Sequence, residues 1–148
     1  MLELRTLFFE DLSVGMTEAL NKTVASSDVI GFAQLTGIAI RSTCPSISPP
    51  RPLRIAHGLY TASLISAVLG TRLPGPGAVY VSQTLNFRAP VRIGDTVEVT
   101  VAVAELFPER LRARLTCICR VRNDIVLDGE ALVKVPSKVA KGRPQPRL

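Results

Sequence analysis

The sequence predicts an α+β domain in which an antiparallel sheet wraps around one central helix. First, the stretch 56–73 has helical character and is apolar on most of its sides, as expected of a helix in the middle of a fold. Second, residues 78–136 alternate apolar and polar positions and are rich in β-branched residues, which is typical of strands. Third, a chain of 148 residues that is 47% hydrophobic suffices for one core without disulfides or metals. We therefore expect a single domain over 1–137.

The N-terminal part reads as a strand followed by a short helix. Residues 17–25 form a weak strand pattern, and either Ser26 or Ser27 can cap the helix that follows, because a serine oxygen accepts a free backbone N–H. We expect this helix to run through Leu35 and to end at Gly37, since glycine adopts the left-handed conformation that terminates helices.

The central helix begins near Ala56, and the sequence LPGPG at 73–77 ends it, because proline cannot continue the backbone hydrogen bonds. Short turn-like gaps separate the β segments beyond it, so we expect consecutive segments to pair antiparallel. One central helix wrapped by such a meander is the hot-dog arrangement. The expected segments are 78–91, 95–107, 110–122 and 124–136.

The segment 38–54 departs from this pattern. It is rich in proline, serine and threonine, and neither helical nor strand periodicity persists through it. We therefore expect an anomalous loop between the two helices.

The net charge of +6 by itself suggests a nucleic-acid partner, but the distribution of the charges along the chain does not. Most of the excess lies in the acid-free segment 38–54 and in the basic tail 138–148, which we expect to be frayed, so the remaining chain is nearly neutral. A groove that follows phosphates needs cations gathered on one folded surface, so we expect no nucleic-acid partner. No stretch approaches the roughly 18 to 20 apolar residues of a membrane span, and the N-terminus does not resemble a signal peptide. The expected location is cytoplasmic, without a membrane partner.

The cysteines indicate core packing, not metal binding. Cys117 and Cys119 would share one face of a strand, and the C-x-C lacks the second ligand pair that a zinc site requires. We expect both to be buried as small apolar residues. The third, Cys44, lies in the anomalous segment. We expect neither a metal nor a cofactor.

Four stretches of the chain carry a family resemblance: FAQLTG at 32–37, RIAHGLYTASLISAVLG at 54–70, LPGPGAVYVSQTLNFRAPVRIGDTV at 73–97 and DGEALVKVP at 128–136. They closely resemble the (R)-specific enoyl-CoA hydratases of the MaoC-like family. This resemblance implies a hot-dog fold, a homodimer whose protomers pair edge to edge, and an acyl-CoA thioester as substrate. The implied reaction belongs to fatty acid metabolism: hydration of an enoyl-CoA, or dehydration of a 3-hydroxyacyl-CoA.

The start of the central helix is the expected thioester site. Free N–H groups and the positive end of the helix dipole suit an oxygen that gains negative charge. The resemblance implies that the Gly58 N–H is the oxyanion donor, with His57 supporting it. The alternative is that Gly58 only eases helix packing and that His57 is a structural histidine.

The acid–base pair of the family is missing from this sequence. The resemblance implies a D-x-N-P-x-H loop directly after the first helix, whose Asp and His transfer the protons. Here Ile38 stands where the family has the aspartate, and Thr43 stands where it has the histidine. Neither side chain can exchange protons at neutral pH, so the site is not competent as written.

Two explanations are open: divergence into a thioester binder, or a displaced reading frame over 38–54. Joining the third base of each codon to the first two of the next permits D-R-N-P-V-H-L-S-E-Y-F-A-A-T-T from residue 38 onward. That sequence resembles the family throughout the missing loop, so we favour displacement.

Three rival functions follow from the same residues. A catalytically inactive acyl-CoA binder would hold a thioester without turnover. An acyl thioesterase would need a carboxylate near the helix start, and Asp28, on the preceding helix, is not an obvious candidate. Nucleic-acid binding through the basic tail would be lost on truncation at Ser137.

Overall fold

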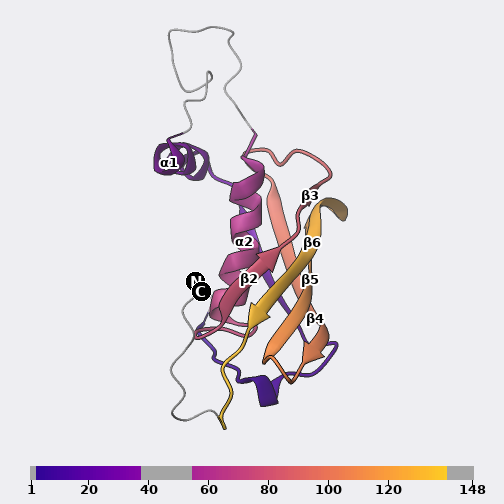
Figure 1. Cartoon of the computed structure of the whole chain (residues 1–148). Helices are drawn as coiled ribbons and strands as arrows, with labels where there is room; N and C mark the ends of the chain where they lie inside the picture. Colours follow the sequence, from indigo (N-terminus) through magenta and orange to yellow (C-terminus); the bar gives the residue numbers. More distant parts are fainter. Residues whose placement is uncertain (1–2, 38–54, 140–148) are drawn as a thin grey trace, which may run out of the picture.

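The computed structural model describes residues 3–37 and 55–139, in which an antiparallel sheet curves around one long helix (Figure 1). This is the hot-dog arrangement expected from the sequence. The elements in chain order are η1 (Phe9–Asp11), β1 (Thr17–Thr23), α1 (Ser26–Thr36), α2 (Gly58–Thr71), β2 (Val79–Gln83), β3 (Asn86–Phe87), β4 (Thr96–Phe107), β5 (Arg112–Val121) and β6 (Asp124–Lys134).

The strands follow the order β1-β4-β5-β6-β2, and β3 also pairs with β6. The prediction of consecutive pairing is confirmed for β4, β5 and β6, but it is wrong for the segment 78–91. That segment breaks into β2 and β3, and both pair with β6 instead of β4. A tight turn places β5 on one edge of β4, and β1 pairs with the other edge of β4, so neither edge of β4 is free. β2 therefore pairs with the free edge of β6.

Gly129 permits the break between β2 and β3. A Cβ at this position would collide with the carbonyl oxygen of Thr84, so the chain crosses β6 where β6 has no side chain. The Thr84 N–H donates to the carbonyl of Glu130, 2.9 Å away, and the Thr84 hydroxyl accepts the Glu130 N–H. Only glycine allows two backbones to approach so closely.

The start of α1 differs from the prediction that a serine caps it. Ala25 is the N-cap residue and donates its N–H to Oδ2 of Asp28, 2.9 Å away, while no side chain of the N-cap accepts a helix N–H. Ser26 is already the first helical residue. The end of the helix is as predicted, because Gly37 adopts the left-handed conformation with φ of 74°.

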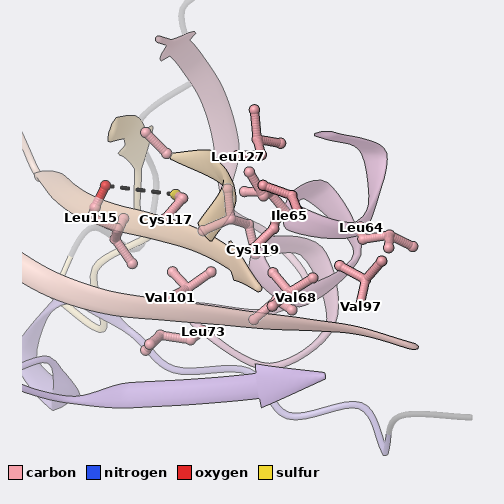
Figure 2. Packing of buried hydrophobic residues seen from close by; sticks show 14 of the residues in the cluster. Leu64, Ile65, Val68, Leu73, Val97, Val101, Leu115, Cys117, Cys119 and Leu127 are labelled. Atoms are coloured by element: carbon pink, nitrogen blue, oxygen red, sulfur yellow. Dashed lines mark hydrogen bonds between the residues drawn. The ribbon is translucent and has the colours of Figure 1, made fainter. Parts of the chain in front are cut away.

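The core lies between α2 and the concave face of the sheet (Figure 2). Ile65 and Val68 of α2 are fully buried, and residues on β4 and β5 alternate between buried and partly exposed. Cys117 and Cys119 lie on the inner face of β5 with no exposed area, which confirms the prediction for them. Burial raises the pKa of the Cys117 thiol to about 11 and that of Cys119 to about 12.

No helix within 3–37 or 55–139 is long and apolar enough to span a membrane.

Candidate active site

The candidate site lies at the first turn of α2, where the chain enters the helix from a short bridge. Ile55 pairs with Arg92, and the Ala56 N–H donates to the Val91 carbonyl at 2.7 Å, which fixes the approach. His57 is the N-cap residue in an extended conformation, with φ of −62° and ψ of 143°. Gly58 is therefore the first helical residue, two positions after the predicted start near Ala56.

The N–H of Gly58 has no hydrogen-bond acceptor among the residues described here. The carbonyl of His57 instead accepts the N–H groups of Tyr60 at 3.0 Å and Thr61 at 3.3 Å, which closes the first turn. The first N–H groups of a helix point along its axis away from the helix, and they carry the positive end of the dipole. Gly58 thus offers a backbone donor for an anionic or polarised oxygen.

A pocket of about 840 Å³ opens in front of this donor. Its walls come from α1, from the start of α2, from Phe87 of β3 and residues 88–91 after it, and from β6. The described lining residues are Phe32, Thr36, Ala56, His57, Gly58, Leu59, Thr61, Phe87, Arg88, Ala89, Pro90, Val91, Val126 and Leu127. The volume is in the range of small-molecule sites, and most of the lining is apolar.

Phe87 lies directly against Gly58. A Cβ built on Gly58 would lie 2.5 Å from Cε1 of Phe87, a distance that ordinary side chains do not reach. Phe87 is 56% exposed, so its ring could move aside for a side chain at moderate cost. Glycine avoids displacing that ring, and it also leaves no side chain of its own beside the backbone N–H, so the structure agrees with both interpretations of Gly58.

His57 is held by aromatic contacts. Its ring lies 5.7 Å from the ring of Phe32 at an interplanar angle of 32°, and Phe32 in turn meets Tyr60 edge to face at 6.1 Å. Nε2 of His57 is buried and has no hydrogen-bond partner within the described part of the chain. A buried polar atom without a hydrogen-bond partner costs about 1–3 kcal/mol of folding free energy.

Asp28 and Tyr60 connect the first turns of α1 and α2. The Tyr60 hydroxyl donates to Oδ2 of Asp28 at 3.2 Å, and Nζ of Lys22 lies 3.5 Å from the same oxygen. The Ala25 N–H, together with Lys22, holds the pKa of Asp28 below its usual value. Burial and the charge of Asp28 raise the pKa of Tyr60 to about 12. At neutral pH Asp28 is ionised and Tyr60 protonated, so the pair fixes the two helices relative to each other.

No aspartate or glutamate is among the described residues that line the pocket. Asp28 is not a lining residue, and its oxygen is occupied by the Ala25 N–H and the Tyr60 hydroxyl. In 3–37 and 55–139 no group of three or more histidine, cysteine, aspartate or glutamate side chains could hold a metal ion.

Ile38 and Thr43, the positions of the missing acid–base pair, lie outside the described residues. The structure nonetheless locates the point from which that segment leaves. Phe32 and Thr36 of α1 line the pocket, and Gly37 ends the helix immediately before residue 38. Residue 38 is therefore only two positions after Thr36, a residue that lines the pocket.

Several contacts at this site could not be found by reading the sequence. At the rim, Arg88 donates to Asp128 at 3.1 Å and Asn86 donates to it at 3.0 Å, and these donors lower the pKa of Asp128. Arg88 and Asp128 belong to the sequence motifs F-R-A-P-V and D-G-E. The sequence does not show, however, the register in which β3 pairs with β6 and brings the two together.

Comparison with known proteins agrees with this architecture. Residues 49–116 match the family model described as a MaoC like domain. The chain is 69% identical over 140 residues to a 3-hydroxybutyryl-CoA dehydratase of Methylorubrum extorquens, covering 92% of this chain and 88% of that protein. It is 47% identical over 134 residues to an (R)-specific enoyl-CoA hydratase of Rhodospirillum rubrum, covering 88% of this chain and 93% of that protein.

Solved structures give the same result. The (R)-hydratase from A. caviae superimposes with a TM-score of 0.76 at 34% identity, over 86% of this chain and 99% of that one. R-hydratase PhaJ1 from Pseudomonas aeruginosa superimposes with a TM-score of 0.82 at 30% identity, over 98% and 97% of the two chains. The fold, the pocket at the start of α2 and these similarities lead to one conclusion: the chain belongs to the MaoC-like domain family.

Proposed function

We propose that this chain is, by family, an (R)-specific enoyl-CoA hydratase, a hydro-lyase that acts on a thioester held at the start of α2. The observation that carries the proposal is the Gly58 N–H, which lacks an acceptor among the described residues and opens on a largely apolar pocket. A thioester carbonyl gains negative charge as water adds to the conjugated double bond. A donor placed at that oxygen lowers the barrier, because it binds the transition state more strongly than the substrate.

The chemistry also needs two proton transfers. One group takes a proton from water while the water oxygen attacks the β-carbon, and another group delivers a proton to the α-carbon. Each of these acid–base groups contributes a factor of roughly 10² to 10⁴ to the rate. The family has Asp and His for this purpose where this chain has Ile38 and Thr43. We therefore propose that the sequence as written binds the thioester at Gly58 and hydrates it slowly or not at all.

A displaced reading frame over 38–54 is our explanation for the missing pair. The alternative frame permits D-R-N-P-V-H where Ile38 to Thr43 stand, and this loop would follow directly from the turn of α1 that lines the pocket. The nucleotide sequence across codons 36 to 56 tests this explanation. A frame that continues unbroken through these codons in independently sequenced DNA would contradict it.

A catalytically inactive acyl-CoA binder is the second candidate, favoured by Ile38 and Thr43 themselves. Such a binder would hold the thioester at the same Gly58 site as the hydratase. The two candidates differ only in whether turnover appears once the D-R-N-P-V-H loop is restored. A thioesterase has less support, because none of the described lining residues is a carboxylate that could activate water.

We further propose that two copies of the chain pair through the free edge of β2. Within the described residues, β2 has β6 on one side and no strand on the other. Large apolar side chains are exposed along this edge and beside the pocket: Tyr80 and Val81 on β2, Phe87 on β3 and Leu59 on α2. An exposed apolar edge strand needs covering, and a second copy supplies a matching edge. A cytoplasmic location stays a prediction from the sequence.

Isothermal titration with crotonyl-CoA tests the binding half of the proposal. We expect the chain as written to bind this thioester without consuming it. Failure to bind at millimolar ligand would contradict both the hydratase and the inactive-binder interpretations.

A further inference from the structure

A second pocket, of about 470 Å³, lies on the outer face of the sheet, away from α2. Ala113 and Leu115 of β5 point into the core and are fully buried, so Arg112 and Arg114, which alternate with them, point outward. The pocket draws on four strands and on the turn between β4 and β5. Its described lining residues are Ser82, Thr84, Phe107, Arg110, Arg112, Arg114, Glu130, Ala131 and Leu132.

The charges in this outer pocket are unequally matched. Three arginines and one carboxylate, that of Glu130, line it, and a second carboxylate, that of Glu105, bonds Arg114 from outside the lining. Arg114 is already neutralised, since it donates to Glu130 at 2.8 Å and to Glu105 at 2.9 Å, and these bonds raise the pKa of its guanidinium. Arg110 and Arg112 form no side-chain hydrogen bond or ion pair with any described residue, so their positive charges are unmatched.

The register of the sheet adds to this imbalance. Arg112 lies directly opposite Lys134 of β6, and on its other side it faces Phe107 of β4. Like charges directly opposite each other on neighbouring strands destabilise a sheet. The preceding residue, Leu111, has a φ of 53° and lies in the turn between β4 and β5, where a left-handed residue helps to close the hairpin.

We infer that the outer pocket binds a phosphorylated small molecule of nucleotide size. Arg110 and Arg112 provide guanidinium donors that match phosphate oxygens in pairs. Phe107 of β4 lines the pocket beside Arg112 and offers an aromatic face for a planar base, while Leu132 lies on the other side of β5. An anion between Arg112 and Lys134 would also relieve their mutual repulsion. This site is separate from the Gly58 pocket, because the sheet lies between them, and it does not depend on the proposed hydratase activity.

Calorimetric titration of the full chain with inorganic pyrophosphate and with ADP, at low ionic strength, tests the inference. We expect both to bind, and ADP to bind more tightly because its base adds contacts with Phe107. Arg112→Gln should weaken both by about tenfold or more, since a hydrogen bond to a charged group is lost. Phe107→Ala should weaken ADP and leave pyrophosphate nearly unchanged. Arg120→Gln is the matched control, an arginine on the outer face of the same strand, and it should retain the affinity of the original chain.

Several results would overturn the inference. They are no binding of either probe at millimolar concentration, full affinity in Arg112→Gln, or an equal loss in Arg120→Gln, which would indicate diffuse surface charge. Loss of ADP binding in Gly58→Val would assign the nucleotide to the pocket at α2 instead.

The melting temperature of each variant separates binding from folding. Arg112→Gln should melt no lower than the original chain, because it removes repulsion from Lys134. If it does melt lower, Arg110→Gln decides the question, since Arg110 lies in the turn outside the strands. Weaker binding in a normally folded Arg110→Gln supports the site, and unchanged binding overturns it.

Discussion

The ring of Phe87 on β3 occupies the space in which a side chain on Gly58 of α2 would begin, since a Cβ there would lie 2.5 Å from Cε1. This contact joins the helix that offers the backbone donor to the strand at the sheet edge. It also explains why the role of Gly58 must be separated from its packing by experiment.

Gly58→Val should weaken crotonyl-CoA binding by at least about tenfold, because the branched side chain blocks approach to the N–H. Part of any loss in stability would come from contact with Phe87. The double variant Gly58→Val/Phe87→Ala removes that contact, so it should regain stability in thermal melts without regaining thioester affinity in titrations. Full affinity in a destabilised Gly58→Val would instead show that the glycine serves packing alone.

Asp28→Asn should lower the free energy of unfolding by about 0.5 to 1.5 kcal/mol at pH 7, because the carboxylate accepts both the Ala25 N–H and the Tyr60 hydroxyl. The pKa of Asp28 is lowered from 3.8 in the folded chain. Its contribution is therefore present above about pH 4 and is lost as the pH falls through the folded value below 3.8. Urea titrations at pH 7 and pH 3 check this. An equal difference between the two proteins at both values would contradict it.

Cys117 and Cys119 should resist thiol reagents in the native protein. Both are fully buried, and burial raises their pKa values to about 11 and about 12, so little thiolate exists at pH 8. Labelling with a disulfide reagent in a Cys44→Ser background should be negligible until urea unfolds the chain, when two thiols react. Rapid labelling of the native protein would indicate that the β5 core opens readily.

Val81→Asp should convert the proposed dimer to a monomer, because it places a charge on the free β2 edge. Light scattering with size exclusion at micromolar concentration measures the mass. Val14→Asp is the control, since Val14 is also exposed, at 64%, but lies before β1. A chain that is monomeric without any substitution would count against a site shared by two protomers.

The sequence predicted those parts of the fold that depend on local periodicity. The apolar helix α2 and the alternating strands β4, β5 and β6 each contain their own signal, and short turns fix which of these strands are neighbours. The pairing of β2 with β6 is a long-range contact and left no local signal, so consecutive pairing was the wrong expectation for that segment. The sequence predicted a serine as the N-cap of α1, but the N-cap is Ala25. Its N–H donates to the Asp28 side chain, and neither Ser26 nor Ser27 accepts a helix N–H as a cap.

The candidate site divides in the same way. Gly58 and His57 were identified from a motif at a helix start, and the structure places both in the pocket. Phe32, Phe87 and Thr61 were not identified, because an apolar or hydroxyl side chain carries no chemical signal until the fold brings it to the site. The unmatched charge of Arg112 likewise depends on its register with Lys134, which only the paired strands reveal.

We propose that Gly58 holds the thioester and that hydration requires an acid–base pair at positions 38 and 43. The most direct test compares the chain as written with a version that carries D-R-N-P-V-H in place of residues 38–43 and the alternative frame through residue 54. Loss of crotonyl-CoA absorbance is followed for both at equal protein concentration and equal dimer content. We expect the restored chain to turn over crotonyl-CoA at least about 10² times faster, the smallest contribution expected of one acid–base group. Robust hydration by the chain as written, or none by a restored chain that binds the thioester, would contradict the claim.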